Sequence, residues 1–185
     1  MTALIDGDSI AYIAGHDKMP NYSGEVTLLE KTEDIAKDQV QSIITEIMNV
    51  TGADEYLLFL SPSKTFRNTI YPDYKANRKS LEPPKFKQVC MDYIKTLPGV
   101  YKCENIEADD AVSICKNKFT DSIICTPDKD ILMLPGKHFN YRKMEFVTTD
   151  AAESSYKFWA SVIVGKLLLT LNLFNSVKPK SVKIW

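Results

Sequence analysis

A short apolar run with carboxylates on both sides constrains this chain of 185 residues more than any other feature. Residues 123–125 (Ile-Ile-Cys) have the character of a buried β-strand, and residues 111–119 place apolar side chains at helical spacing. Ligands of α/β folds bind beyond the carboxyl ends of the strands. The sequence therefore predicts one edge of a sheet that carries the acidic residues at the helix start and after the strand, namely Glu107, Asp109, Asp110, Asp128 and Asp130.

Carboxylates gathered at such an edge repel one another unless a cation lies among them. Their oxygen atoms suit Mg²⁺ or Mn²⁺ better than zinc. A structural interpretation stands beside this one, because acidic residues also cap helices and favour the first helical turn. Asp128-Lys129-Asp130 after Pro127 is also compatible with a plain turn. Each motif alone favours the structural interpretation, and the two together favour a metal site.

Strand and helix patterns alternate along the whole chain. Apolar runs at residues 3–5, 56–60, 100–103 and 123–125 predict buried strands. Helical patterns follow at residues 10–14, 32–50 with Thr32 as N-cap, 83–97, and from Asp150, which with Glu153 forms a capping box. Two hairpins are expected, at residues 25–29 and 138–148. The alternation predicts an α/β fold with a mainly parallel central sheet flanked by helices, in which Asp6 ends the first strand at the same acidic edge.

Residues 61–84 have a different composition. Five cations against Asp73 and Glu82 give this segment a local charge of +3, and aromatic side chains lie between them. Cations and stacking rings are what a strand of nucleic acid requires. A solvated loop whose aromatic rings pack inward explains the same composition. The residues concerned are Lys64, Arg67, Lys75, Arg78 and Lys79, with Phe66, Tyr71 and Tyr74.

Overall composition sets the remaining limits. A net charge of -1 gives no general attraction to nucleic acid, so such binding needs a local patch. The four cysteines show no C-x-x-C spacing and are expected to be reduced core residues of a cytosolic protein. No signal peptide is expected, and residues 162–174 are too short and polar a run to span a membrane. Trp159 is expected in the core, and His16 and His138 are expected to have no catalytic duty.

Four motifs occur in the order found in one family. They are residues 4–7 (Leu-Ile-Asp-Gly), 71–78 (Tyr-Pro-Asp-Tyr-Lys-Ala-Asn-Arg), 107–110 (Glu-Ala-Asp-Asp) and 126–130 (Thr-Pro-Asp-Lys-Asp). Over residues 1–165 the chain resembles the 5′ nuclease family of flap endonucleases and 5′→3′ exonucleases, and its bacteriophage members most. The resemblance implies a PIN-like fold, with residues 61–84 as an arch or clamp. It also implies Mg²⁺-dependent hydrolysis of DNA at 5′ ends or junctions, in replication or DNA degradation.

The resemblance also assigns roles to individual residues. Two Mg²⁺ ions about 4 Å apart, with Mn²⁺ as a substitute, would have six ligands, some through water: Asp6, Glu107, Asp109, Asp110, Asp128 and Asp130. Lys75 and Arg78 would act catalytically on the phosphate, and Tyr74 would stack on a base. The DNA-binding set would be Lys64, Arg67, Tyr74, Lys75, Arg78 and Lys79. The expected partner is DNA with a free 5′ end, flap or nick, or an RNA–DNA hybrid, bound by a monomer in the bacterial cytoplasm.

Two departures from the family pattern stand out. Many relatives have a metal-binding Asp shortly before Phe66-Arg67, where this chain has residues 61–64 (Ser-Pro-Ser-Lys). After Gly165 the family continues with Gly-Asp and a glycine-rich helix–hairpin–helix, whereas residues 166–185 contain neither. We hypothesise a frameshifted and truncated gene, or a sequencing slip, with a naturally short member as the alternative, and expect a poor or inactive nuclease.

Two other functions compete with the 5′ nuclease interpretation. Asp6-Gly7-Asp8 fits the D-x-D opening of haloacid-dehalogenase-type phosphohydrolases, with Asp6 as nucleophile and Asp8 as general acid. The unusual tail also fits a remnant that binds nucleic acid without cutting it.

Overall fold

The computed structural model describes residues 1–17, 31–72, 74–75 and 82–174, with residues 165–174 as backbone alone. Within these ranges the chain forms one six-stranded sheet in the order β3-β2-β1-β4-β5-β6. All neighbouring strands are parallel except β5 and β6, which form an antiparallel hairpin. The expected mainly parallel sheet is therefore confirmed. The strands are β1 (Thr2–Asp6), β2 (Glu55–Leu60), β3 (Val100–Lys102), β4 (Ser122–Cys125), β5 (Gly136–Asn140) and β6 (Glu145–Thr149).

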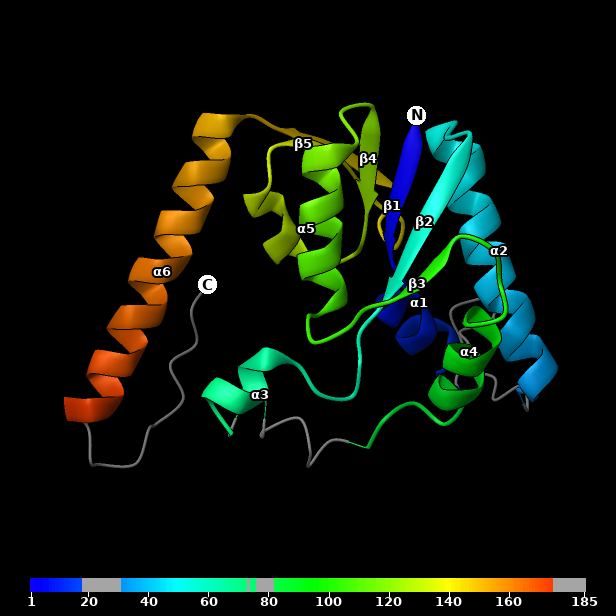
Figure 1. Cartoon of the computed structure of the whole chain (residues 1–185), viewed down its shortest axis with the longest axis horizontal. Helices are drawn as coiled ribbons and strands as arrows, with labels where there is room; N and C mark the ends of the chain where they lie inside the picture. The colour runs from blue at the N-terminus through cyan, green and yellow to red at the C-terminus, as the bar shows by residue number, and fades with distance from the viewer. Residues whose placement is uncertain (18–30, 73, 76–81, 175–185) are drawn as a thin grey trace, which may run out of the picture.

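Helices cover both faces of the sheet (Figure 1). Helices α1 (Gly7–Ala14), α2 (Glu33–Thr51) and α4 (Lys87–Ile94) pack together on one face. Helix α5 (Ala108–Lys118) covers the other face. The remaining elements are α3 (Phe66–Ile70), the 3₁₀ helix η2 (Lys129–Met133) and α6 (Ala151–Phe174).

Each face of the sheet has its own apolar core, because successive side chains of a strand point to opposite faces. Ala3 and Ile5 of β1 belong to the larger cluster beneath α1, α2 and α4, and Phe139 of β5 is buried in the same cluster. Leu4, between them, belongs to the smaller cluster under α5, together with Val112. Burial on both faces explains why the central strands β1 and β4 contain short, unbroken apolar runs.

Local signals set the helix ends where the sequence predicted them. The hydroxyl of Thr32 accepts from the backbone N–H of Ile35 and caps α2 as expected. Gly52 ends that helix with φ of 64°, a left-handed conformation that glycine adopts without strain. The carboxylate of Asp150 accepts from the N–H of Glu153 at the start of α6.

One local prediction was wrong. The helix expected from Pro83 begins only at Lys87, because residues 82–86 pack against the end of α1, where Phe86 N–H donates to the Gly15 carbonyl over 2.9 Å. Helix α3 lies inside the segment read as an arch, and a capping box between Thr65 and Asn68 begins it. The hairpin expected at residues 25–29 lies outside the described residues.

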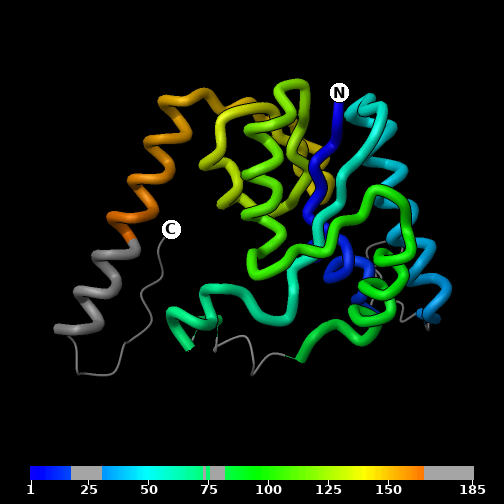
Figure 2. The backbone as a smooth tube through the Cα atoms, in the orientation of Figure 1, coloured from blue at the N-terminus to red at the C-terminus, as the bar shows by residue number. Residues whose placement is uncertain are grey.

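Helix α6 differs most from expectation. It runs along one side of the molecule, with η2 beside its first turns (Figures 1 and 2). The prediction that Trp159 is a core residue was wrong, since 61% of it is exposed, and Tyr156 and Ile163 are exposed as well. The helix continues through Gly165, so the domain boundary proposed there stays a prediction.

The four cysteines and His138, which were expected to have no catalytic duty, lie in ordinary surroundings. All four cysteines are free thiols; Cys90 and Cys125 are buried, and Cys103 and Cys115 are partly buried. His138 is buried, and its Nε2 atom bonds to the Leu134 carbonyl. Across the described part of the chain, no helix combines the length and hydrophobicity that a membrane span requires.

Candidate functional site

A cavity of about 1520 Å³ lies at the carboxyl ends of the parallel strands. Its lining includes Asp6 from the end of β1, Asp8 from α1, Glu107 and Asp109 from the start of α5, and Asp128 from the turn after β4. Residues more than 120 positions apart thus meet in one place, because β1 and β4 are neighbours and run in the same direction. The acidic edge predicted from the sequence is present.

Asp6 is the most buried of these carboxylates, with 6% of the residue exposed. One carboxylate oxygen accepts from the backbone N–H groups of Asp8 and Ser9, which makes Asp6 the N-cap of α1. The other oxygen accepts from the Ser9 hydroxyl. Burial raises the pKa of Asp6 to about 7, and the nearby charges of Asp109 and Asp8 act in the same direction.

Asp109 lies at the centre of the electrostatic repulsion. Its pKa is raised first by burial and then by the charges of Asp128 and Glu107. Such a group of mutually repelling oxygen donors is suited to a hard divalent cation. Within the described ranges, no three His, Cys, Asp or Glu side chains stand close enough together to hold one ion directly. Mg²⁺ commonly keeps several waters and needs only one or two carboxylates, so the donor set still fits that ion.

Ser61 braces two of the acidic segments. Its backbone N–H donates to both carboxylate oxygens of Asp8, over 3.2 and 3.3 Å. Its hydroxyl accepts from the backbone N–H of Ala108, the first residue of α5, over 2.8 Å. Ser61 thus ties α1 to the start of α5.

Asp110 points to a different partner. Its two oxygens accept from the Arg67 guanidinium over 2.5 and 2.7 Å, and it also accepts from the Glu107 backbone N–H in a capping box. The Arg67 hydrogen bonds lower the pKa of Asp110. Figure 1 shows α3, which carries Arg67, beneath the amino end of α5. The pair therefore fastens α3 to α5.

Glu107 binds two residues of the predicted arch, Tyr74 and Lys75. Its carboxylate accepts from the Tyr74 hydroxyl over 2.9 Å and from Lys75 Nζ over 2.6 Å. The Lys75 ammonium also lies 5.2 Å from the centre of the Tyr74 ring. A basic and an aromatic residue of the predicted arch are thereby held at the acidic edge.

The cavity unites some of the predicted site residues and not others. Those that line it are Asp6, Glu107, Asp109, Asp128 and Lys75. Among the described residues, the following do not line it: Asp110, Asp130, Lys64, Arg67 and Tyr74. Arg78 and Lys79 lie outside the described residues.

The cavity also contains residues that the sequence did not point to. Besides His16, which was expected to have no catalytic duty, five basic side chains line it: Lys85, Lys87, Lys95, Lys102 and Arg142. They come from separate segments, so no local cluster marks them. Lys87 and Lys95 are two helical turns apart, beside the buried residues Cys90 and Ile94 of α4, and this spacing is the one signal that could have identified them.

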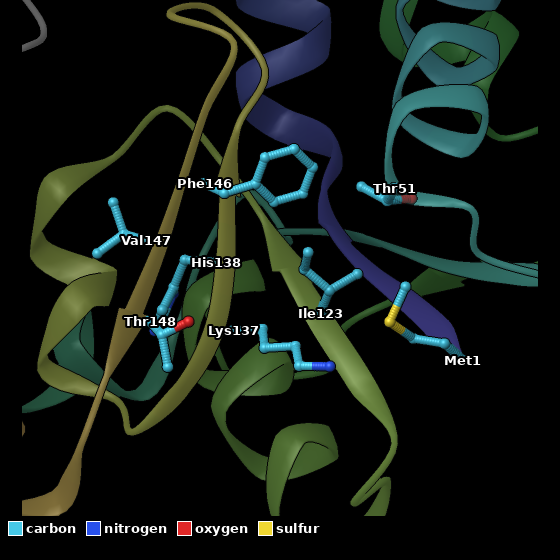
Figure 3. A pocket seen from close by; sticks show the side chains of 8 residues that line it. All are labelled: Met1, Thr51, Ile123, Lys137, His138, Phe146, Val147 and Thr148. Atoms are coloured by element: carbon cyan, nitrogen blue, oxygen red, sulfur yellow. The ribbon is translucent and has the colours of Figure 1, made fainter.

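A second, smaller hollow of about 200 Å³ lies at the opposite edge of the sheet (Figure 3). Figure 3 shows Phe146 and Lys137 on its wall, with Ile123 between them and Met1. No carboxylate of the described residues lines it. Of these two cavities, only the large one combines acidic with basic side chains, whereas Lys137 and His138 line the small hollow.

Comparison with protein families agrees with this arrangement. Residues 1–158 match the model of the 5′-3′ exonuclease, N-terminal resolvase-like domain. The chain is 36% identical over 85 residues to a 5′-3′ exonuclease of Aquifex aeolicus (strain VF5), an overlap of 42% of this chain and 29% of that protein. It is 27% identical over 144 residues to a 5′-3′ exonuclease of Buchnera aphidicola subsp. Schizaphis graminum, covering 70% of this chain and 48% of that protein.

Solved structures share the fold. A variant of the bacteriophage T5 flap endonuclease, in a pseudo-enzyme–product complex with DNA and metal ions, matches with a TM-score of 0.59 and 11% identity. The T5 5′-exonuclease with bound zinc matches with a TM-score of 0.58 and 15% identity. Each match covers 80% of this chain and 57% of the other. This agreement confirms the resolvase-like, PIN-like fold.

The chain spans about half, or less, of the length of the relatives that it matches. The family model nevertheless covers nearly all of the described sheet and helices, including every carboxylate of the large cavity. The chain therefore belongs to the 5′-3′ exonuclease family, of which it carries the N-terminal resolvase-like domain.

Proposed function

We propose that this chain hydrolyses phosphodiester bonds of DNA near a free 5′ end, flap or nick, with divalent metal ions bound at the large cavity. The observation that carries the proposal is the convergence of Asp6, Asp109 and Asp128 from three separate segments on one cavity that Lys75 also lines. The similar T5 enzyme crystallised with DNA and metal ions supports this substrate class.

The metal ligands proposed are the cavity-lining carboxylates of Asp6, Glu107, Asp109 and Asp128. Divalent ions there would supply an activated water and would stabilise the leaving oxygen of the phosphodiester. Mg²⁺ is the ion that an all-oxygen donor set favours, with Mn²⁺ as its substitute. Asp110 and Asp130 do not line the cavity, and for Asp110 to serve as a ligand it would have to leave Arg67.

The remaining cavity residues would act on the substrate. Lys75 would hold the scissile phosphate and offset its developing negative charge, which requires its ammonium to exchange the Glu107 carboxylate for the phosphate. Tyr74 beside it would offer a ring on which a base can stack. Asp6, held by Ser9 and by the start of α1, would keep one carboxylate fixed at the end of β1.

A cleavage assay tests this function. The purified chain is given a 5′-flap duplex, a nicked duplex and an RNA–DNA hybrid, with Mg²⁺ or with EDTA. We expect scission only with the metal, and a loss of about 100-fold or more in Asp109→Asn. Asp38→Asn, which makes the same chemical change on the exposed surface of α2, should leave the rate unchanged.

The non-catalytic alternative has its own signature in this assay. DNA binding that persists in Asp109→Asn, with no scission by the parent chain under any condition, would refute the nuclease and leave a nucleic-acid-binding domain. Equal scission by the parent chain and by Asp109→Asn would point to a contaminating nuclease.

A further inference from the structure

Helix α4 has one face in the core and one face in the large cavity. Cys90 and Ile94 are fully buried against α1 and α2. Lys87, Met91 and Lys95 lie one helical turn apart on the strip next to these two residues, and all three line the cavity, although Met91 also packs against the core. The cavity that contains the acidic edge is therefore bounded by a helix face that presents lysines.

Two more lysines extend this face. Lys85, which precedes α4, and Lys102 at the end of β3 are exposed and line the same cavity. Over the whole lining, six Lys and Arg side chains stand against seven carboxylates. The lining as a whole is therefore close to neutral, and most of its positive charge comes from these four lysines.

The four lysines are not equally available. Lys95 forms an ion pair of 2.6 Å with Asp92, which offsets its charge. Lys85 lies over the Phe86 ring at 5.1 Å from its centre, a contact that leaves the ammonium without a carboxylate counter-charge. The structure records no ion pair for Lys85, Lys87 or Lys102 with any described carboxylate. These three are the cations to which an external anion can bind.

Arg67, on the opposite side of the acidic edge, differs in this respect. Its guanidinium is bound in bidentate fashion to Asp110 and lies 3.8 Å from Glu107. A phosphate would have to displace two carboxylates to reach it. Within residues 61–84, the charges of Arg67 and Lys75 are thus paired with carboxylates of the protein itself. Lys85, Lys87 and Lys102 instead line the open cavity.

We propose that Lys85, Lys87 and Lys102 form a phosphate-binding wall that holds the DNA backbone beside the carboxylates. The inference rests on the proposed function, and it names the surface that binds the strand next to the scissile phosphate. Lysines on such a wall contact phosphates without reading the sequence, and each contact releases counterions. Binding through the wall should therefore depend on salt and not on base sequence.

The test compares two triple variants with equal changes in charge. One is Lys85→Ala/Lys87→Ala/Lys102→Ala, and the control is Lys37→Ala/Lys118→Ala/Lys137→Ala, whose lysines lie outside the large cavity. Affinity for a 5′-flap duplex is measured in EDTA over a series of salt concentrations. Circular dichroism melting confirms that both variants fold, and a Lys85→Arg/Lys87→Arg/Lys102→Arg variant tests for rescue by charge.

We expect the wall variant to bind at least about tenfold more weakly at 0.1 M salt, with a slope of log K against log [salt] smaller by about 2. The control and the arginine variant should keep the parent slope. Equal salt slopes for the two alanine triples would overturn the inference, because DNA affinity would then depend only on the net charge of the chain and not on where the lysines lie.

Cleavage by the parent chain is scored separately. If the parent chain cleaves DNA and the two alanine triples bind DNA equally well, the nuclease function stands and the phosphate-binding wall is refuted. If the two triples differ in DNA binding as expected but the parent chain never cleaves DNA, the phosphate-binding wall stands and the nuclease function is refuted. A parent chain that binds no DNA would overturn both.

Discussion

The Arg67 guanidinium and the Asp110 carboxylate make the closest link between α3 and α5. Their geometry is bidentate, and both side chains are only partly exposed, at 29% and 27%. Bidentate pairs of this kind are stronger than ordinary surface ion pairs, although solvent still screens this one. The pair therefore contributes to stability as well as to the position of Glu107, whose backbone N–H bonds to the same carboxylate.

A double-mutant cycle measures this contribution. Arg67→Gln and Asp110→Asn should each lower the free energy of unfolding in EDTA, and the double variant should lose less than the sum, with a coupling of about 1 kcal/mol. The coupling is expected to persist in saturating Mg²⁺, because the cavity-lining carboxylates remain available to the ion. Its disappearance in Mg²⁺ would identify Asp110 as a metal ligand.

Asp6 gives the fold a dependence on pH. Burial raises its pKa from 3.8 to about 7, so the folded chain holds the Asp6 proton more tightly than the unfolded chain. Stability from this residue is fully present below about pH 4 and is lost as pH rises to about 7, a change of up to about 4 kcal/mol. An ionised Asp6 in the metal-free chain is thus a source of strain that a cation would relieve.

Asp6→Asn removes this titration. Its free energy of unfolding in EDTA, relative to the parent chain, should rise between about pH 4 and pH 7 and level off above that range. Denaturant melts at several pH values give this difference directly. A difference that stays constant with pH would show that the Asp6 pKa is not raised in the folded chain.

Among the elements, α6 shows that a helical pattern of apolar residues does not by itself bury them. Its apolar residues recur at helical spacing, but Tyr156, Trp159 and Ile163 are exposed. Trp159→Ala should therefore change the free energy of unfolding by less than about 1 kcal/mol, most of it from the Phe158 ring 5.3 Å away. Phe139→Ala, at a fully buried ring of β5, should cost about 3–5 kcal/mol. A loss of similar size at Trp159 would mean that α6 packs in solution against a surface absent from this structure.

Local patterns were sufficient for most elements. The apolar runs at 3–5, 56–60 and 123–125 became β2 and the central strands β1 and β4, because residues buried on both faces must be apolar throughout. The Thr32 cap needed only its neighbours along the chain. Carboxylates that end parallel strands could be placed at one edge for the same reason, and Asp6 and Asp128 do meet there.

Long-range contacts decided what local patterns could not. Arg67 and Asp110 are 43 positions apart, and the sequence around each residue does not predict that they pair. The late start of α4 depends on the Gly15 carbonyl of α1. The exposure of Trp159 depends on what lies opposite α6, which periodicity does not report. The lysines of the α4 wall likewise share a surface only after the sheet has formed.

For the whole molecule, the acidic edge is the place where folding brings together like charges from separate parts of the chain. Asp6, Asp109 and Asp128 belong to β1, α5 and the turn after β4, and their charges repel one another in the folded state. The unfolded chain keeps these residues far apart and has no such site. A divalent ion should therefore bind the folded chain preferentially and stabilise it as a whole.

Mg²⁺ should accordingly raise the melting temperature of the entire domain. At ten times its dissociation constant, an ion that binds only the folded state adds about 1.4 kcal/mol, which corresponds to about 3–6 °C for a chain of this size. Thermal melts in MgCl₂ are compared with melts in KCl of equal ionic strength. Asp109→Asn should lose the Mg²⁺-specific increase, and Asp38→Asn on α2 should retain it. If Asp109→Asn gained as much from Mg²⁺ as the parent chain, the ion would be stabilising the protein somewhere other than this edge of the sheet.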